Sequence, residues 1–135
     1  MIRVVADSNV YVSAIIFGGK PQTVLELAQE GQIELFISDD ILAEVTRILR
    51  DKFGRSREQL EADVMALDAI TTRVQAIERI DAVTADADDN RILECAVAAG
   101  SECIVSGDSD LLALGKFRGI KIQRPAEFLG ESRRR

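Results

Sequence analysis

The chain has 135 residues, of which 47% are apolar and 4% aromatic, and its formal net charge is −6. A chain of this length forms one domain whose core needs neither disulfides nor a structural metal. The negative charge repels DNA and RNA at long range, which counts against a protein that binds nucleic acid through general basicity alone but does not exclude a nuclease.

In the first half of the chain, short apolar runs alternate with helical patterns. Residues 2–6 and 33–37 are apolar runs that predict two buried strands. Four helices are expected where apolar residues recur at helical spacing, and three of them end at glycines. The predicted helices are 9–17, 23–29, 39–52 with Ser38 as its N-cap, and 57–72.

The second half continues the alternation with shorter elements. Residues 74–83 hold one or two extended pieces, and Asp88 is a candidate N-cap for a helix at 89–99. The elements expected after it are a strand at 102–106, a helix at 110–114, a strand at 120–122 and a closing turn or helix from Pro125.

This alternation predicts an α/β fold with a central, mostly parallel β-sheet flanked by helices. No linker or repeat divides the chain, so we expect one domain over residues 1–130, followed by a frayed basic tail at 131–135. Parallel sheets of this kind bind ligands at the carboxyl ends of their strands. Residues that directly follow a strand are therefore the first candidates for a functional site.

Three aspartates occupy such positions. Asp7 follows the strand at 2–6, and Asp108 and Asp110 follow the strand at 102–106. An isolated aspartate after a strand is commonly a helix N-cap or a turn residue. Three of them at the ends of two neighbouring strands favour a shared cleft, which Asp108 and Asp110 would both face from an extended turn.

Two further acids lie on or beside the apolar faces of predicted helices. The carboxylate of Asp89 either caps its helix or binds a cation, and Asp86 and Asp88 are alternative caps. Glu44 either points into the same cleft or pairs with a neighbouring base on the surface. Carboxylates gathered in one cleft repel each other, and oxygen-preferring cations such as Mg²⁺ or Mn²⁺ would compensate. A site of that kind suits phosphate chemistry.

Polar residues surround these acids in the sequence. Ser106 ends its strand just before the paired acids, where its hydroxyl could bond a carboxylate or a metal-bound water. Asn9 is a second polar neighbour, and Ser8 either joins the site or caps the first helix. Glu94 projects from another side of its helix and is expected to be solvated, with a supporting position behind the site as the alternative.

A basic run follows Glu44, beginning on the same predicted helix and ending just beyond it. Its members would suit contacts with a nucleic-acid backbone, although solvated helix faces explain the run equally well. The candidate residues are Arg47, Arg50, Lys52 and Arg55.

Residue types that the chain lacks narrow the chemistry further. Without histidine there is no Ser-His-Asp triad and no histidine-bound zinc, and no Gly-x-x-x-x-Gly-Lys run forms a phosphate loop. Cys95 and Cys103 have no metal-ligand spacing and are expected to be buried. With no signal peptide and no apolar run of membrane-spanning length, a cytoplasmic protein is predicted.

Four short motifs follow one another along the chain in an order that a known family shares. In them the sequence resembles PIN-domain proteins, and most of all the VapC-like toxins of prokaryotic type II toxin–antitoxin pairs. The motifs are Asp7-Ser8-Asn9-Val10, Ser38-Asp39-Asp40-Ile41-Leu42-Ala43-Glu44-Val45, Asp88-Asp89-Asn90-Arg91 and Ser106-Gly107-Asp108-Ser109-Asp110. One difference is that Ser8 stands where the family commonly has threonine.

The resemblance implies a three-layer PIN-like fold and a Mg²⁺- or Mn²⁺-dependent endoribonuclease. It also implies an RNA substrate, a homodimer, and neutralisation by a small antitoxin protein. By this carry-over the acidic core is Asp7, Glu44, Asp89 and Asp108, with Asp110 as an additional metal ligand and Ser106 and Asn9 as supporting polar residues.

Two other functions remain open at this point. A haloacid-dehalogenase-type phosphatase also begins with an aspartate at a strand end, but position 9, where its second acid would lie, is asparagine here. A module that binds metal and a partner with little turnover would have the same sequence features as an active nuclease.

Overall fold

The computed structural model describes residues 1–133, with the side chains of 131–133 left out, and is built around one six-stranded sheet. The strand order is β3-β2-β1-β4-β6-β5, and all neighbours are parallel except β5 and β6. The strands are β1 (Ile2–Ala6), β2 (Ile33–Ile37), β3 (Thr72–Arg73), β4 (Cys103–Val105), β5 (Lys116–Phe117) and β6 (Ile120–Gln123). The predicted α/β fold with a mostly parallel sheet is therefore confirmed.

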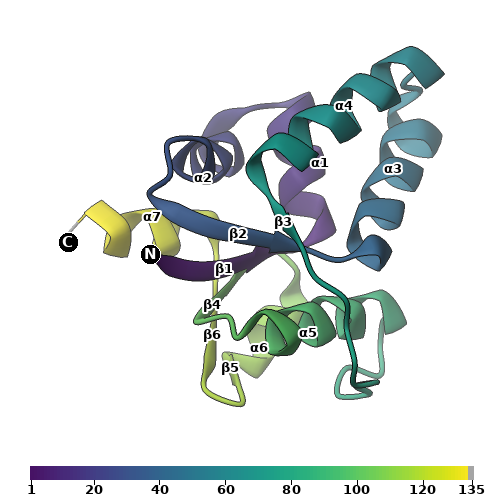
Figure 1. Cartoon of the computed structure of the whole chain (residues 1–135). Coiled ribbons are helices and arrows are strands. Elements are labelled where there is room, and N and C mark those ends of the chain that lie inside the picture. Colours follow the sequence, from purple (N-terminus) through teal and green to yellow (C-terminus); the bar gives the residue numbers. More distant parts are fainter. Residues whose placement is uncertain (134–135) are drawn as a thin grey trace.

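Helices cover both faces of this sheet. Figure 1 shows α1 to α4 on one side of β1 and β2, and α5 and α6 on the other. The helices are α1 (Ser8–Ile16), α2 (Gly19–Gln29), α3 (Asp39–Phe53), α4 (Arg57–Ile70), α5 (Ala87–Ala99), α6 (Ser109–Leu114) and α7 (Pro125–Arg133). None of the helices within residues 1–133 combines the length and apolar character needed to cross a bilayer.

The central strands β1 and β4 form the middle of the core. Val5 lies opposite Ile104 and Ala6 opposite Val105, and all four side chains are fully buried. Strands covered on both faces read as continuous apolar runs, which is why these segments were recognisable in the sequence. From β1 the chain moves outward to β2 and β3, and later returns to β4 and β6 on the other side. The reversal of strand order leaves a crevice between the carboxyl ends of β1 and β4.

Most boundaries follow the predictions, and the differences have local causes. Helix α2 starts at Gly19 instead of residue 23, because Pro21 fits into a first helical turn, where no backbone donor is required. Helix α5 starts at Ala87 and is capped by Asp86, so the prediction that Asp88 caps it is wrong. Asp86 accepts a hydrogen bond from the backbone N–H of Asp88 at 2.9 Å.

The hairpin of β5 and β6 was not predicted as such. Arg118 and Gly119 have φ values of 49° and 82°, a pair of left-handed residues that reverses the chain between the two strands. The predicted extended pieces at 74–83 are also absent from the described structure, where β3 ends at Arg73. Instead this segment is tied to α5 by side-chain hydrogen bonds.

Two buried side chains of α5 hold that segment. The Asn90 amide accepts from the N–H groups of Ala82 and Val83 and donates to the Val83 carbonyl, at 2.7–2.9 Å. Glu94 accepts from the Ile80 N–H at 2.8 Å and pairs with Arg91 at 2.8 Å. Because Glu94 is buried, the expectation that it is solvated is wrong. The two side chains fix the path of the chain toward Asp86.

Both cysteines are buried, as expected, and neither forms a disulfide within the described residues. Helix α7 includes residues 131–133 of the predicted basic tail. Residues 134–135 lie outside the described part of the chain, so fraying of the tail stays a prediction.

Candidate metal centre

The crevice between β1 and β4 brings the first two predicted acids together. Asp7 and Asp108 follow these neighbouring strands, and the Asp7 N–H donates to the Val105 carbonyl at 3.0 Å. The fully buried hydroxyl of Ser106 donates to the Asp7 carboxylate and accepts from the Asp108 N–H at 3.0 Å. Ser106 therefore joins the two strand ends, and its predicted bond to a carboxylate is present.

A small cleft of about 30 Å³ opens at this place. This volume holds one or two water-sized particles, since about 10–15 Å³ suffices for one. Its lining includes four predicted acids and two more from the start of α5, namely Asp7, Glu44, Asp86, Asp88, Asp89 and Asp108. The predicted acidic core thus lies in one cleft, and Asn9 and Ser8 line it as well.

Asp110 joins the group from the exposed side. One carboxylate oxygen from each of Asp89, Asp108 and Asp110 can be chosen so that all three lie within 4.8 Å of one another. Oxygen ligands at this spacing can contact one shared cation. The structure therefore brings together all five carboxylates that the sequence singled out.

Three helix N-termini point at the cleft, and carboxylates of the cleft cap each of them. Asp7 caps α1 by accepting from the Val10 N–H at 3.0 Å, and Asp86 caps α5. Asp108 caps α6, accepting from the N–H groups of Asp110 at 2.9 Å and Leu111 at 3.1 Å. The positive ends of three helices partly compensate the crowded negative charge.

This capping corrects two expectations. Asp108 and Asp110 do not share an extended turn, because Asp108 satisfies the free donors at the start of α6 and Asp110 lies in its first turn. Ser8 is not the cap of α1, because Asp7 takes that role. The Ser8 hydroxyl lies near Glu44 and lowers the pKa of its carboxyl group. No hydrogen bond of ordinary geometry joins the two side chains.

Asp89 is the most unbalanced member of the cleft. Its side chain is buried, with 7% exposure, and Oδ2 has no hydrogen-bond partner among the described residues. Burial and then repulsion by Asp108 and Asp86 raise the pKa of Asp89 to about 7. Since Asp86 is the cap of α5, capping does not explain why the carboxylate of Asp89 is buried.

Burial also raises the pKa of Asp7 and of Glu44. For Asp7 the hydrogen bonds from Ser106 and Val10 partly oppose this increase in pKa. For Glu44, repulsion by Asp88 adds to the burial effect, and the Arg47 guanidinium opposes it. The carboxylates are therefore held together at an electrostatic cost that a cation would remove.

The donor set fits a hard divalent ion. Within the described residues, the cleft offers carboxylate, hydroxyl and amide oxygens and neither thiolate nor imidazole. The unpartnered Oδ2 of buried Asp89 is the atom that most clearly requires such a ligand.

Each of the three candidate arginines of the basic run already has an acidic partner. Lys52 is exposed. The shortest contacts are Arg47 with Asp88 at 3.4 Å, Arg50 with Asp51 at 2.8 Å, and Arg55 with Asp63 at 2.7 Å.

Asp86 and Asp88 line the cleft although neither was predicted to belong to the site. Both were candidate helix caps, and Asp86 has that role as well. The only sequence signal for them was the density of acids between Asp86 and Asp110.

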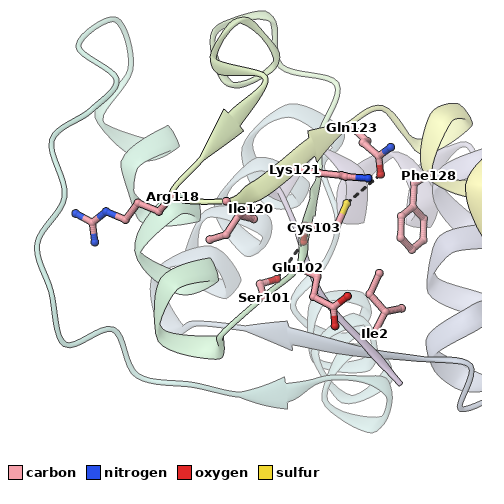
Figure 2. A pocket seen from close by; sticks show the side chains of 10 residues that line it. Ile2, Ser101, Glu102, Cys103, Arg118, Ile120, Lys121, Gln123 and Phe128 are labelled. Carbon is pink, nitrogen blue, oxygen red and sulfur yellow. Dashed lines mark hydrogen bonds between the residues drawn. The ribbon is translucent and has the colours of Figure 1, made fainter.

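A second hollow, of about 390 Å³, lies at the amino ends of β1, β4 and β6, and is named the amino-edge hollow. Figure 2 shows Cys103 pointing toward Gln123, with the Sγ and Oε1 atoms 3.3 Å apart. Ile2 and Phe128 supply apolar walls, and Arg118 lies at one side. No group of three clustered acids is found here within the described residues.

Comparison with known proteins identifies the family to which this fold belongs. A family model for the PIN domain matches residues 3–110. A similar solved structure is that of VapBC2 from Rickettsia felis bound to a DNA fragment from their promoter, with a TM-score of 0.65 and 15% identity. The alignment covers 91% of this chain and 98% of the other. No curated protein matches the sequence. The extent of the family match shows that this chain belongs to the PIN-domain family.

Proposed function

We propose that this protein is a Mg²⁺- or Mn²⁺-dependent endoribonuclease that hydrolyses RNA phosphodiester bonds. The observation that carries the proposal is the buried, unpartnered carboxylate oxygen of Asp89 among six other acids at the carboxyl edge of the sheet. A divalent ion bound there would supply positive charge to the reacting phosphate and make a bound water more acidic.

The side chains have distinct roles in this proposal. Asp89, Asp108 and Asp110 would hold the ion, since their oxygens already lie within reach of one another. Asp7, fixed by Ser106 and the Val10 N–H, would supply a further ligand in a fixed orientation.

Glu44 would complete the cleft from α3. Its raised pKa suits a carboxylate that holds a proton from the attacking water. Asn9, exposed at the rim, would donate a hydrogen bond to the phosphate.

Membership of the PIN-domain family and the fold shared with the VapBC2 structure support a biological role as well. We propose that the chain is the toxin of a toxin–antitoxin pair, acts in the cytoplasm as a homodimer, and is inhibited by an antitoxin protein.

The direct test is RNA cleavage by the purified chain, free of any partner, in Mn²⁺, Mg²⁺ and EDTA. Asp108→Asn should lose metal-dependent cleavage, because it removes a charged ligand from the group of three. Asp51→Asn is the matched control, since Asp51 is an exposed aspartate paired with Arg50. Equal cleavage by both variants would refute the assignment and indicate a contaminating nuclease.

The phosphatase alternative is disfavoured by the environment of Asp7. Asn9, two positions after Asp7, stands where phosphatase chemistry requires a second acid. Release of phosphate from an aryl phosphate would reverse this conclusion. Metal binding without cleavage of any RNA would instead favour the partner-binding module.

A further inference from the structure

We propose that Arg47 exchanges partners during substrate binding: it pairs with Asp88 in the free protein and moves to a backbone phosphate when an RNA strand enters. The inference rests on the proposed ribonuclease function and adds the residue that receives the substrate at the cleft.

Arg47 lies where such a strand would arrive. It follows Glu44 by three positions on α3, so the two side chains share one face of that helix. Glu44 and Asp88 both line the cleft, and the Arg47 Nη2 atom is 3.4 Å from the Asp88 Oδ2 atom. The ion pair therefore connects α3 with the first turn of α5, at the edge of the acidic site.

Arg47 brings a positive charge to the edge of a cleft whose lining is acidic. No lysine or arginine is found among the cleft-lining residues in the described part of the chain. Arg47 is nevertheless close enough to lower the pKa of Glu44. It can thus offset the repulsion that the acids exert on a polyanion.

The existing partnership is weak enough to be exchanged. Arg47 donates one hydrogen bond to Asp88, and the two side chains remain 54% and 50% exposed. Exposed pairs of this kind contribute little to stability. A phosphate offers the guanidinium two oxygens in a matching fork, which is the stronger arrangement.

Another arginine of the basic run shows the contrast. Arg55 holds Asp63 with two hydrogen bonds, at 2.7 and 3.0 Å, and its side chain is only 25% exposed. Moving Arg55 would leave the buried carboxylate of Asp63 without its partner. Arg55 is thus a structural residue, whereas Arg47 is available.

The experiment measures binding, separately from cleavage. The probe is a short, fluorescently labelled single-stranded RNA, titrated with the full chain in Ca²⁺ by anisotropy and checked afterwards on a gel for intactness. Arg47→Gln should weaken binding about fivefold and lower the slope of log affinity against log salt by about one, as expected for one lost phosphate contact.

Arg118→Gln is the matched control. Arg118 is also about half exposed and also pairs with one carboxylate, that of Glu78, but it lies at the amino-edge hollow (Figure 2). The substitution removes the same charge, and binding should change by less than about twofold. An equal loss in both variants would mean that only net charge matters, and it would overturn the inference.

A double-mutant cycle with Asp88→Asn tests the exchange itself. If Arg47 leaves Asp88 on binding, Asp88→Asn increases RNA affinity more in the parent chain than in Arg47→Gln, because only the parent must break the pair. If Arg47 stays on Asp88, the increase is equal or smaller in the parent, and the exchange is refuted.

The outcomes separate this inference from the proposed function. If the predicted binding pattern occurs without any cleavage in Mn²⁺, the Arg47 assignment stands and the nuclease proposal fails. If the chain cleaves RNA and Arg47→Gln binds like the parent, the inference alone fails. Absence of RNA binding by the parent chain would also overturn the inference.

Discussion

The two ends of the parallel strands differ in size and in charge. The carboxyl-edge cleft measures about 30 Å³ and is crowded with acids, whereas the amino-edge hollow measures about 390 Å³ and mixes apolar walls with groups of both signs. Only the cleft contains a buried carboxylate oxygen without a partner among the described residues. Between these two ends, volume favours the amino-edge hollow, whereas unbalanced buried charge favours the edge where parallel sheets carry their sites.

The largest expected difference between the two ends is in activity. Asp89→Asn should reduce metal-dependent RNA cleavage by at least about a hundredfold, because it removes the negative charge of a ligand and replaces one of its two oxygens with an NH2 group that cannot bind a cation. Glu102→Gln, at the amino-edge hollow, should keep activity near that of the parent. Initial rates in Mn²⁺ make the comparison, and comparable losses in both variants would remove the distinction between the two ends.

The second difference is in the pH dependence of stability. The pKa of Asp89 rises from 3.8 when unfolded to about 7 in the metal-free fold, so the folded protein binds more protons between these values. This contribution to stability is present at low pH and is lost as the pH rises through about 7. We expect the free energy of unfolding to fall by about 1–3 kcal/mol from pH 5 to pH 8.

Chemical denaturation in EDTA at the two pH values measures this loss. Asp89→Asn should remove most of the loss and be more stable than the parent at pH 8, and Mn²⁺ should restabilise the parent alone. A parent protein that gains stability from pH 5 to pH 8 in EDTA would contradict the account.

Two buried serines allow a sharper comparison. Ser106→Ala removes the bond to Asp7 and the acceptor for the Asp108 N–H, so it should cost about 1–3 kcal/mol and about 10- to 100-fold in activity. Ser101→Ala, at the other end, removes bonds to the carbonyls of Arg3 and Cys103. Ser101→Ala should lower stability but leave activity near that of the parent. If the two variants lost activity in the same proportion to their loss of stability, Ser106 would have no role in the site beyond stabilising the fold.

The smallest effect concerns the hollow itself. Cys103 is 2% exposed although it borders this hollow, so its thiol should react with a thiol reagent only after local opening or unfolding. The burial-raised pKa of Cys95, about 12, makes that thiol still less reactive. The absorbance change of a chromogenic thiol reagent at neutral pH measures the labelling rate, with Cys103→Ser as control. Rapid labelling of Cys103 would show that the amino-edge hollow opens readily to solvent.

Much of the fold could be predicted because its central strands are simple signals. The runs that became β1 and β2 had their bounds right, since each contains only one charged residue, Arg3 or Glu34, among apolar residues that are typical of strands covered on both faces. The two-residue strands β3 and β5 could not be predicted, because pairing with neighbours defines them and their composition does not.

The acids of the site were predictable because strand ends and helix faces have fixed positions in a parallel sheet. Capping was considered for several of them, but the sequence could not decide which acid caps which helix, since capping by Asp7, Asp86 and Asp108 depends on backbone angles that side-chain spacing does not reveal. The burial of Glu94 was missed for a related reason. Its partners Ile80 and Arg79 lie on a loop whose path no periodic pattern describes.

The segment between β3 and α5 has one further consequence. Its tip carries Ile77, 94% exposed, while Asn90 and Glu94 fasten only the part from Arg79 onward. A chain divided at this tip would separate the acids into two pieces, with Asp7 and Glu44 on the first and the remaining members on the second. Neither fragment could build the centre alone, so restored cleavage after mixing would make this fold a split reporter of fragment reassembly.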